Sequence, residues 1–176
     1  LYLSLTAKAA RLRAIGEGTP YVAPEEVVKE DPKTAEEEQR LYENVTNELN
    51  AQVSIARQQY QQRSQEQAEA LARQRQAANA YESTAKELSV TKPLLSSGAV
   101  SEVEILRLER DVTRFKGERD VAAAQVARAG AAMAEATRKI QEVELAVRNN
   151  ASKELSETMS RLNSIVQSSA GLVDKV

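Results

Sequence analysis

Apolar residues follow a seven-residue repeat, regular in its spacing, through the second half of the chain. From Ile105 to Val147 they recur at alternating steps of three and four, and only Arg119 interrupts them. Such a repeat keeps one apolar stripe on a single side of an α-helix and winds paired helices into a left-handed supercoil. The sequence therefore predicts a long helix that needs a partner. The stripe consists of Ile105, Leu108, Val112, Phe115, Arg119, Ala122, Val126, Ala129, Met133, Ala136, Ile140, Val143 and Val147.

A second stripe with the same spacing occupies the first half of the chain. We expect its helix to begin near Thr34, which can serve as the N-cap ahead of three glutamates in the first turn. Polar Ser64, Gln67 and Gln74 weaken the middle of the stripe. Its members are Tyr42, Val45, Leu49, Val53, Ala56, Tyr60, Ser64, Gln67, Leu71, Gln74, Ala78, Tyr81, Ala85 and Leu88.

A short break separates the two helices, in the segment TKPLLSSGAVSEVEILRLERD at residues 91–111. Pro93 removes a backbone donor, and Gly98 permits a left-handed turn. Ser101 followed by Glu104 is the capping-box pattern of a new helix. The stripes could meet within one chain as a hairpin, or each could pair with its copy in a parallel rod. The break favours the hairpin, because a rod needs a continuous helix.

The remaining segments complete an all-α prediction. Residues 1–15 place five apolar residues on one face of a short helix, which Gly16 is expected to end. Residues 16–33 form a Pro/Gly loop that Val27 and Val28 can anchor. After Val147 the stripe takes a four-residue step to Ala151 and another to Leu155, a stutter that can mark where the short helix joins. We expect that helix beside residues 155–166.

The predicted architecture is therefore an elongated antiparallel coiled-coil hairpin with a short third helix at its open end. The first long helix spans 34–92, the tip spans 93–100, and the second long helix spans 101–176.

Composition excludes several classes of function. The charges are balanced, with 24 basic and 26 acidic residues, and no basic block indicates nucleic-acid binding. His and Cys are absent, and the carboxylates are scattered, so we expect no catalytic, metal-binding or cofactor-binding residues and no enzyme activity. No apolar stretch approaches the ~20 residues of a membrane-spanning helix. Because the sequence starts at Leu1, within the predicted first helix and without a methionine, we expect it to be a fragment of a longer protein.

Four apolar residues at the tip form the candidate binding site. Leu94, Leu95, Ala99 and Val100 lie at the far end of the predicted hairpin, where no core can bury them. They could fold over the turn to close the coiled coil, or they could dock into another protein. Both can hold, with some residues closing the turn while others face outward.

Two segments carry a resemblance to a known family. The sequence LLSSGAVSEVEILRLERD resembles the hairpin tip of periplasmic adaptors, also called membrane fusion proteins. The sequence RLRAIGEGTPYV resembles the segment that precedes their hairpin. The similarity is strongest to haemolysin-type (HlyD-like) adaptors of type I secretion systems. Many family tips carry an Arg–Leu–Ser pattern; Leu94 and Ser101 match its leucine and serine, whereas Val90 occupies the arginine position.

The resemblance implies a bridging role in the periplasm. The tip, with Leu94, Leu95, Val100 and Ser101, would dock on a TolC-like outer-membrane channel, and the other end would contact an inner-membrane ABC transporter. Several copies, commonly six, would form a ring, and the full-length protein would be anchored in the inner membrane. Lipoyl and barrel domains would flank the hairpin. A multidrug-efflux adaptor and a generic coiled-coil scaffold are the alternative interpretations.

Overall fold

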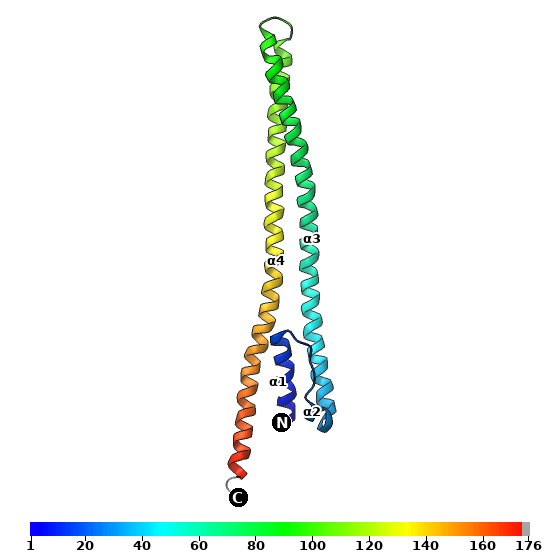
Figure 1. Ribbon diagram of the computed structural model, residues 1–176, viewed down its shortest axis with the longest axis vertical. Coiled ribbons are helices and arrows are strands. Elements are labelled where there is room, and N and C mark those ends of the chain that lie inside the picture. Colours follow the sequence, from blue (N-terminus) through cyan, green and yellow to red (C-terminus); the bar gives the residue numbers. More distant parts are fainter. Residues whose placement is uncertain (174–176) are drawn as a thin grey trace. The chain divides into compact units, whose positions relative to one another are not determined.

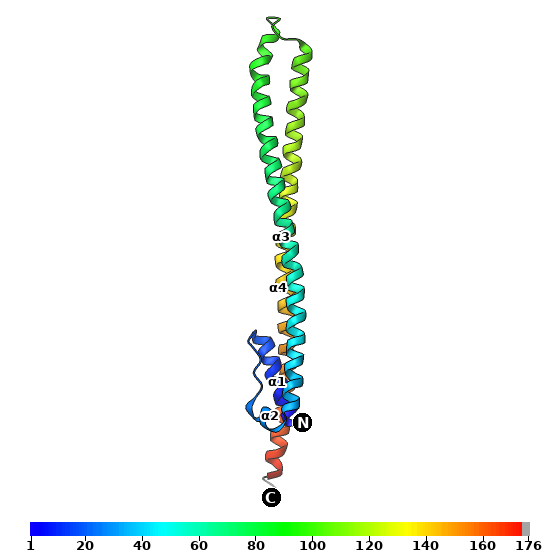
Figure 2. The ribbon, with the colours of Figure 1, turned by 90° about the vertical axis from the view of Figure 1, so that its right-hand side faces the viewer.

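The protein is an α-helical hairpin with a short additional helix at its N-terminus. The computed structural model describes residues 1–173, and the last three residues of the predicted second helix lie outside this range. The order of elements is α1 (Tyr2–Glu17), α2 (Glu25–Glu30), α3 (Pro32–Thr91), the 3₁₀ helix η1 (Lys92–Leu95) and α4 (Glu102–Val173). Helices α3 and α4 run in opposite directions and meet at the turn (Figures 1 and 2). The predicted fold class is confirmed.

Contacts divide the chain into two compact units, which we describe separately. The first contains residues 1–56 and the part of α4 that begins at Arg138. We call it the three-helix unit after α1, α3 and α4, and the short α2 also lies in it. The second spans Arg57–Thr137, and we call it the hairpin unit because it contains the turn and the adjoining parts of α3 and α4.

In the hairpin unit, α4 buries the stripe that the heptad pattern predicts. Ile105, Ala122 and Ala129 are 3–7% exposed, and the other members of the stripe in this unit are buried or half-buried. The polar member, Arg119, places its guanidinium carbon 4.8 Å from the centre of the Tyr81 ring on α3. A cation–π contact of this kind stabilises an arginine within a mostly apolar seam.

On α3, the predicted stripe is half-buried from Ser64 to Leu88 and its member Tyr60 is exposed, while two alanines beside the stripe are buried more deeply. Ala70 and Ala77 are 2% and 6% exposed, whereas the predicted Leu71 and Ala78 are only half-buried. The most buried positions of both helices in this unit are therefore mainly alanines. Small side chains let helix backbones approach closely, because interaxial distance depends on the residues at the contact. The leucine, being larger, lies at the edge of the seam.

Gln67 is a polar member of the seam that contacts α4 directly. Its side-chain Nε2 donates a hydrogen bond to the Val126 carbonyl oxygen at 3.4 Å. The same atom lies 3.1 Å from the position that a Cβ would occupy on Gly130. Close by, Arg73 donates to the Gln125 side chain at 3.1 Å. A polar residue within a heptad seam can fix the register of two helices, and Gln67 is placed to do so.

The two glycines of α4 in this unit are expected to respond differently to replacement by alanine. A Cβ on Gly117 would meet nothing within 4 Å, so Gly117→Ala should raise the free energy of unfolding by about 1 kcal/mol through helix propensity. Gly130→Ala should gain clearly less, because its methyl group would displace the Gln67 amide. Urea denaturation of both variants checks this, and equal gains would show that Gln67 yields its place without cost.

In the three-helix unit, α1 is buried on two sides (Figure 1). Leu5 and Ala9 pack with Leu162 of α4, and the partly buried residues around them are Leu155, Met159 and Ile165. The expected docking of the first helix beside residues 155–166 is thus confirmed. On its other side, Ala7 packs with Val27 of α2 and Ala35 of α3. Val27 is fully buried and anchors residues 16–33, as predicted. This segment is not loop throughout, because it contains the short helix α2.

The predicted end of α1 at Gly16 is wrong. The helix continues to Glu17, and Gly18 takes the left-handed conformation (φ 72°). The Gly18 amide donates to the Ile15 carbonyl, and the Thr19 amide donates to the Ala14 carbonyl, which together form a Schellman cap. Gly16 has a different role, because a Cβ there would lie 3.2 Å from the Ser152 hydroxyl oxygen of α4. It therefore permits close approach of two helices.

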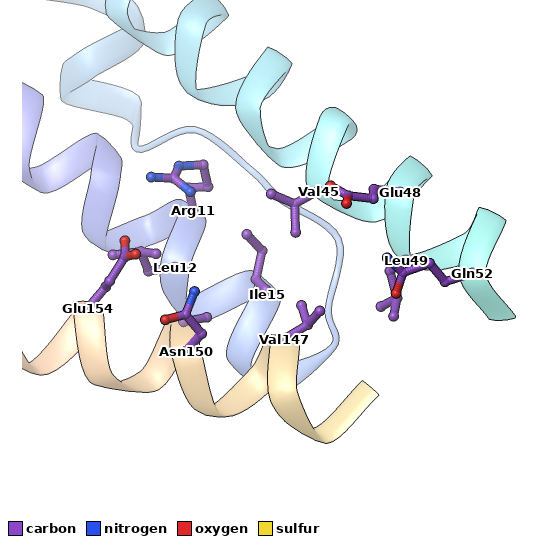
Figure 3. A pocket seen from close by; sticks show the side chains of 11 residues that line it. Arg11, Leu12, Ile15, Val45, Glu48, Leu49, Gln52, Val147, Asn150 and Glu154 are labelled. Carbon is purple, nitrogen blue, oxygen red and sulfur yellow. The ribbon is translucent and has the colours of Figure 1, made fainter. Parts of the chain in front are cut away.

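Helix α1 ends beside the stutter of α4. Gly16 and Gly18 lie against Ser152 and Arg148, within the four-residue steps that follow Val147. An open cavity of about 270 Å³ lies here between α1, α3 and α4 (Figure 3). The stutter thus lies where α1 joins α3 and α4 as a third helix, as the sequence suggested.

The start of α3 also differs from its prediction. The helix begins at Pro32, and Asp31 rather than Thr34 caps it. The Asp31 carboxylate accepts hydrogen bonds from the Thr34 hydroxyl at 2.7 Å and from the Thr34 amide at 3.3 Å. These two bonds lower the pKa of Asp31. Proline suits the first helical position, because a backbone N–H at this position would have no partner within the helix and its absence costs nothing.

Candidate functional site

The turn between α3 and α4 is compact and closed by its own hydrogen bonds. The Ser96 and Ser97 hydroxyls donate to the carbonyls of Pro93 and Leu94, at 3.1 and 2.8 Å. The amide of Gly98, which has φ 76°, donates to the Leu95 carbonyl at 3.2 Å. Short serines therefore satisfy backbone carbonyls that a helix end would leave free. The prediction that Gly98 supplies a left-handed turn is confirmed.

Ser101 caps the restarted helix as predicted. Its hydroxyl oxygen accepts a hydrogen bond from the Glu104 amide at 3.3 Å, which is the first bond of a capping box. Lys92, the first residue of η1, lies 3.6 Å from a carboxylate oxygen of Glu109 on α4. Both groups are largely exposed, so this ion pair contributes little to stability.

The residues proposed to dock, Leu94, Leu95, Val100 and Ser101, differ in exposure, and Ala99, the fourth apolar residue of the tip, is exposed. Leu94 and Leu95 are 43% and 39% exposed, whereas Val100 is half-buried. Ser101 is exposed even though its hydroxyl caps α4. Val100 therefore contributes to closing the turn, and the two leucines present apolar surface at its outside.

Comparisons with known proteins agree with this architecture. A family model described as AprE, long alpha-helical hairpin, matches residues 1–175. The chain belongs to this family. Among solved structures, the hairpin is similar to the soluble domain of LipC, a membrane fusion protein of a type I secretion system. The TM-score is 0.85 at 14% identity, and the match covers 99% of this chain and 87% of the LipC chain. A search of curated protein sequences gave no significant match.

These comparisons bear out the resemblance to membrane fusion proteins that the two sequence segments indicate. The turn that contains Leu94 and Leu95 therefore joins the two long helices of an AprE-family hairpin.

Sequence reasoning missed three exposed apolar residues close to the turn of this AprE-family hairpin. Val90 on α3 is 64% exposed, and Val103 and Leu106 on α4 are 66% and 57% exposed. Their position relative to the heptad stripe could have identified them as exposed. Val103, for example, lies about 200° round the helix from buried Ile105. Apolar residues so far from a seam are outside the predicted core.

Neither metal-binding nor membrane-spanning features occur in the part of the chain that the structure describes. No three or more His, Cys, Asp or Glu side chains there are grouped so that they could hold a metal ion. None of the described helices combines the length and the apolar character needed to cross a membrane.

Proposed function

We propose that this hairpin is the periplasmic arm of a type I secretion adaptor. Its turn would dock on a TolC-like outer-membrane channel, and the full-length adaptor would bridge this channel to an inner-membrane ABC exporter. The role is mechanical and non-enzymatic. The observation that carries the proposal is the exposure of Leu94 and Leu95 on a turn that hydrogen bonds hold in shape. Family membership and the similarity to LipC support it.

The chemistry of the turn suits docking between helices. Two neighbouring leucines can enter an apolar groove between the helix ends of a channel, as the side chains of amphipathic helices enter grooves in other complexes. Because the hydrogen-bonded turn is already ordered, docking would cost little conformational entropy. A single contact of two leucines is weak. A ring of adaptor copies, commonly six in this family, would repeat the contact, and avidity would supply the strength.

The proposal is tested by Leu94→Asp in the full-length protein. We expect export to fall at least tenfold, because a carboxylate would have to be desolvated in the apolar groove. The circular dichroism and melting temperature of the 176-residue chain should change little, because Leu94 is 43% exposed and lies outside the seam between the long helices.

Leu145→Asp is the matched control. Leu145 is an exposed leucine like Leu94, but it lies on α4 in the three-helix unit and not at the turn. It should leave export intact. Normal export by the Leu94→Asp protein at normal abundance would contradict docking through the turn.

A further inference from the structure

The outer face of α4 in the hairpin unit carries a second heptad row. It starts at Val103 and proceeds by alternating steps of four and three, on the side of the helix away from the buried stripe. Every member as far as Arg128 is exposed. The row consists of Val103, Arg107, Arg110, Arg114, Gly117, Val121, Ala124 and Arg128. We call these eight residues the outer row.

The charge of the outer row is one-sided. It contains four arginines and no carboxylate, although the whole chain has slightly more acidic than basic residues. Arg114 lies 4.0 Å from Asp111, within the same helix, and its guanidinium stacks on Phe115. Within the described residues, Arg107, Arg110 and Arg128 have no carboxylate within 4.0 Å. The row therefore presents unpaired guanidinium groups, which prefer carboxylate partners.

The uncharged members of the row have no partner within the chain. Val103 and Val121 are 66% and 59% exposed, and Leu106 beside the row is 57% exposed. Gly117 costs the helix about 1 kcal/mol relative to alanine. No internal contact explains this glycine, because a Cβ there would meet nothing within 4 Å. Glycine at an exposed helix position allows another backbone to approach closely.

A groove beside the row could receive the side chains of such a partner. It has a volume of about 590 Å³ and is lined by both helices of the hairpin unit. Gly117 and Val121 of the row line it, together with Phe115 and with Ala77 and Ala80 of α3. The rest of the lining is mostly polar and includes Arg73 and Glu118, so an approaching helix would meet apolar surface at Phe115, Val121 and the alanines and a further guanidinium at Arg73.

We infer that the outer row of α4 is a docking seam for an acidic α-helix of another protein. Spacing by three and four matches the side chains of a helix that packs along α4. The row has room for several turns, because eight members over 26 residues extend about 38 Å at ~1.5 Å per residue. The interface is additional to the proposed docking at the turn, since it lies along the helix and recognises negative charge.

A second copy of this chain fits the row less well. The positions of α3 farthest from its buried stripe include Ala72, Asn79 and Lys86, all exposed. They offer no carboxylate, and Lys86 would bring like charge to the arginines. The charge of the row therefore favours a partner with its own acidic helix.

Binding of a designed helical peptide to the 176-residue chain tests the inference. The probe is a fluorescent 28-residue amphipathic helix with Glu at the positions that face the row and Ala between them. We expect binding that weakens with salt, because exposed charges are screened. The double variant Arg107→Glu/Arg110→Glu should weaken binding at least tenfold. The control double variant Arg75→Glu/Lys86→Glu, on exposed positions of α3, should not.

The other outcomes are informative as well. Equal binding of a peptide with Lys in place of Glu, or an unchanged affinity in the Arg107/Arg110 double variant, would overturn the inference. Concentration-dependent self-association that the same double variant abolishes would identify a second copy as the partner and would also overturn it. Leu94→Asp should leave peptide binding unchanged, so failure of the proposed function at the turn and failure of the outer row can be told apart.

Discussion

Ala122→Asp is expected to lower the free energy of unfolding by about 3 kcal/mol or more. Ala122 is 3% exposed in the seam between α3 and α4. A carboxylate there would be largely desolvated, and such burial either costs several kcal/mol or forces the helices apart. Urea denaturation followed by circular dichroism measures the effect.

Ala124→Asp is the matched control for this seam prediction. Ala124 lies two residues further along α4 and is exposed, so its replacement should cost less than about 1 kcal/mol, mainly through helix propensity. If both aspartates had similar effects, the buried stripe of α4 would be assigned to the wrong face.

Arg11→Met is expected to have the second largest effect, because it would leave Glu38 without its partner. The side chains of Arg11 and Glu38 form an ion pair and are only 11% and 13% exposed. Removing one member of a buried pair typically costs about 3–5 kcal/mol, because the other charge remains desolvated. We expect roughly 3 kcal/mol, since the pair lies beside the open cavity of the three-helix unit.

The surroundings of this ion pair contain a second polar group. The Tyr21 hydroxyl is buried with no hydrogen-bond partner among the described residues. Burial, and to a lesser extent the nearby Glu38 carboxylate, raise the pKa of Tyr21. Tyr21 is therefore uncharged, and of the two side chains Arg11 and Tyr21 beside Glu38, Arg11 carries the positive charge that pairs with the carboxylate.

Two further variants isolate the role of the Arg11–Glu38 pair. Arg13→Met on the exposed side of α1 should change stability by less than about 0.5 kcal/mol. Arg11→Met/Glu38→Met should recover most of the loss, because two methionines leave no buried charge. A double variant as unstable as Arg11→Met alone would show that the loss comes from packing of the arginine stem rather than from the unpaired carboxylate.

The fold could be predicted from sequence where the signal was long and regular. Thirteen positions of α4 follow one heptad stripe, and all of them are buried or half-buried. The restart at Ser101 was also predictable, because a serine three residues before a glutamate has a defined hydrogen-bond geometry at a helix start.

Other features could not be predicted because neighbouring residues offered equivalent choices. On α3, Ala70 and Leu71 are adjacent and both apolar, and only the closeness of α4 selects the smaller one. At the start of α3, Asp31 and Thr34 are both good N-caps, and the proline between them decides. Gly16 and Gly18 both suit a helix end, but Gly16 is used for packing against Ser152.

The candidate site was located from sequence but not resolved into roles. The exposed leucines of the turn follow from the absence of a core at the break. Which of the four residues close the turn depends on backbone geometry that hydropathy does not encode. The outer row could not be predicted from hydropathy, because most of its members are arginine, glycine or alanine, although its spacing on the opposite side of α4 is the same as that of the buried stripe.

Photo-crosslinking from the turn during export tests the central claim most directly. A photoreactive residue placed at Leu95 of the full-length adaptor should form an adduct with the outer-membrane channel of the system. The same residue placed at exposed Gln65, near the end of the hairpin unit that is far from the turn, should not. The account would be contradicted if the Leu95 position, in protein that still supports export, formed no adduct with the channel.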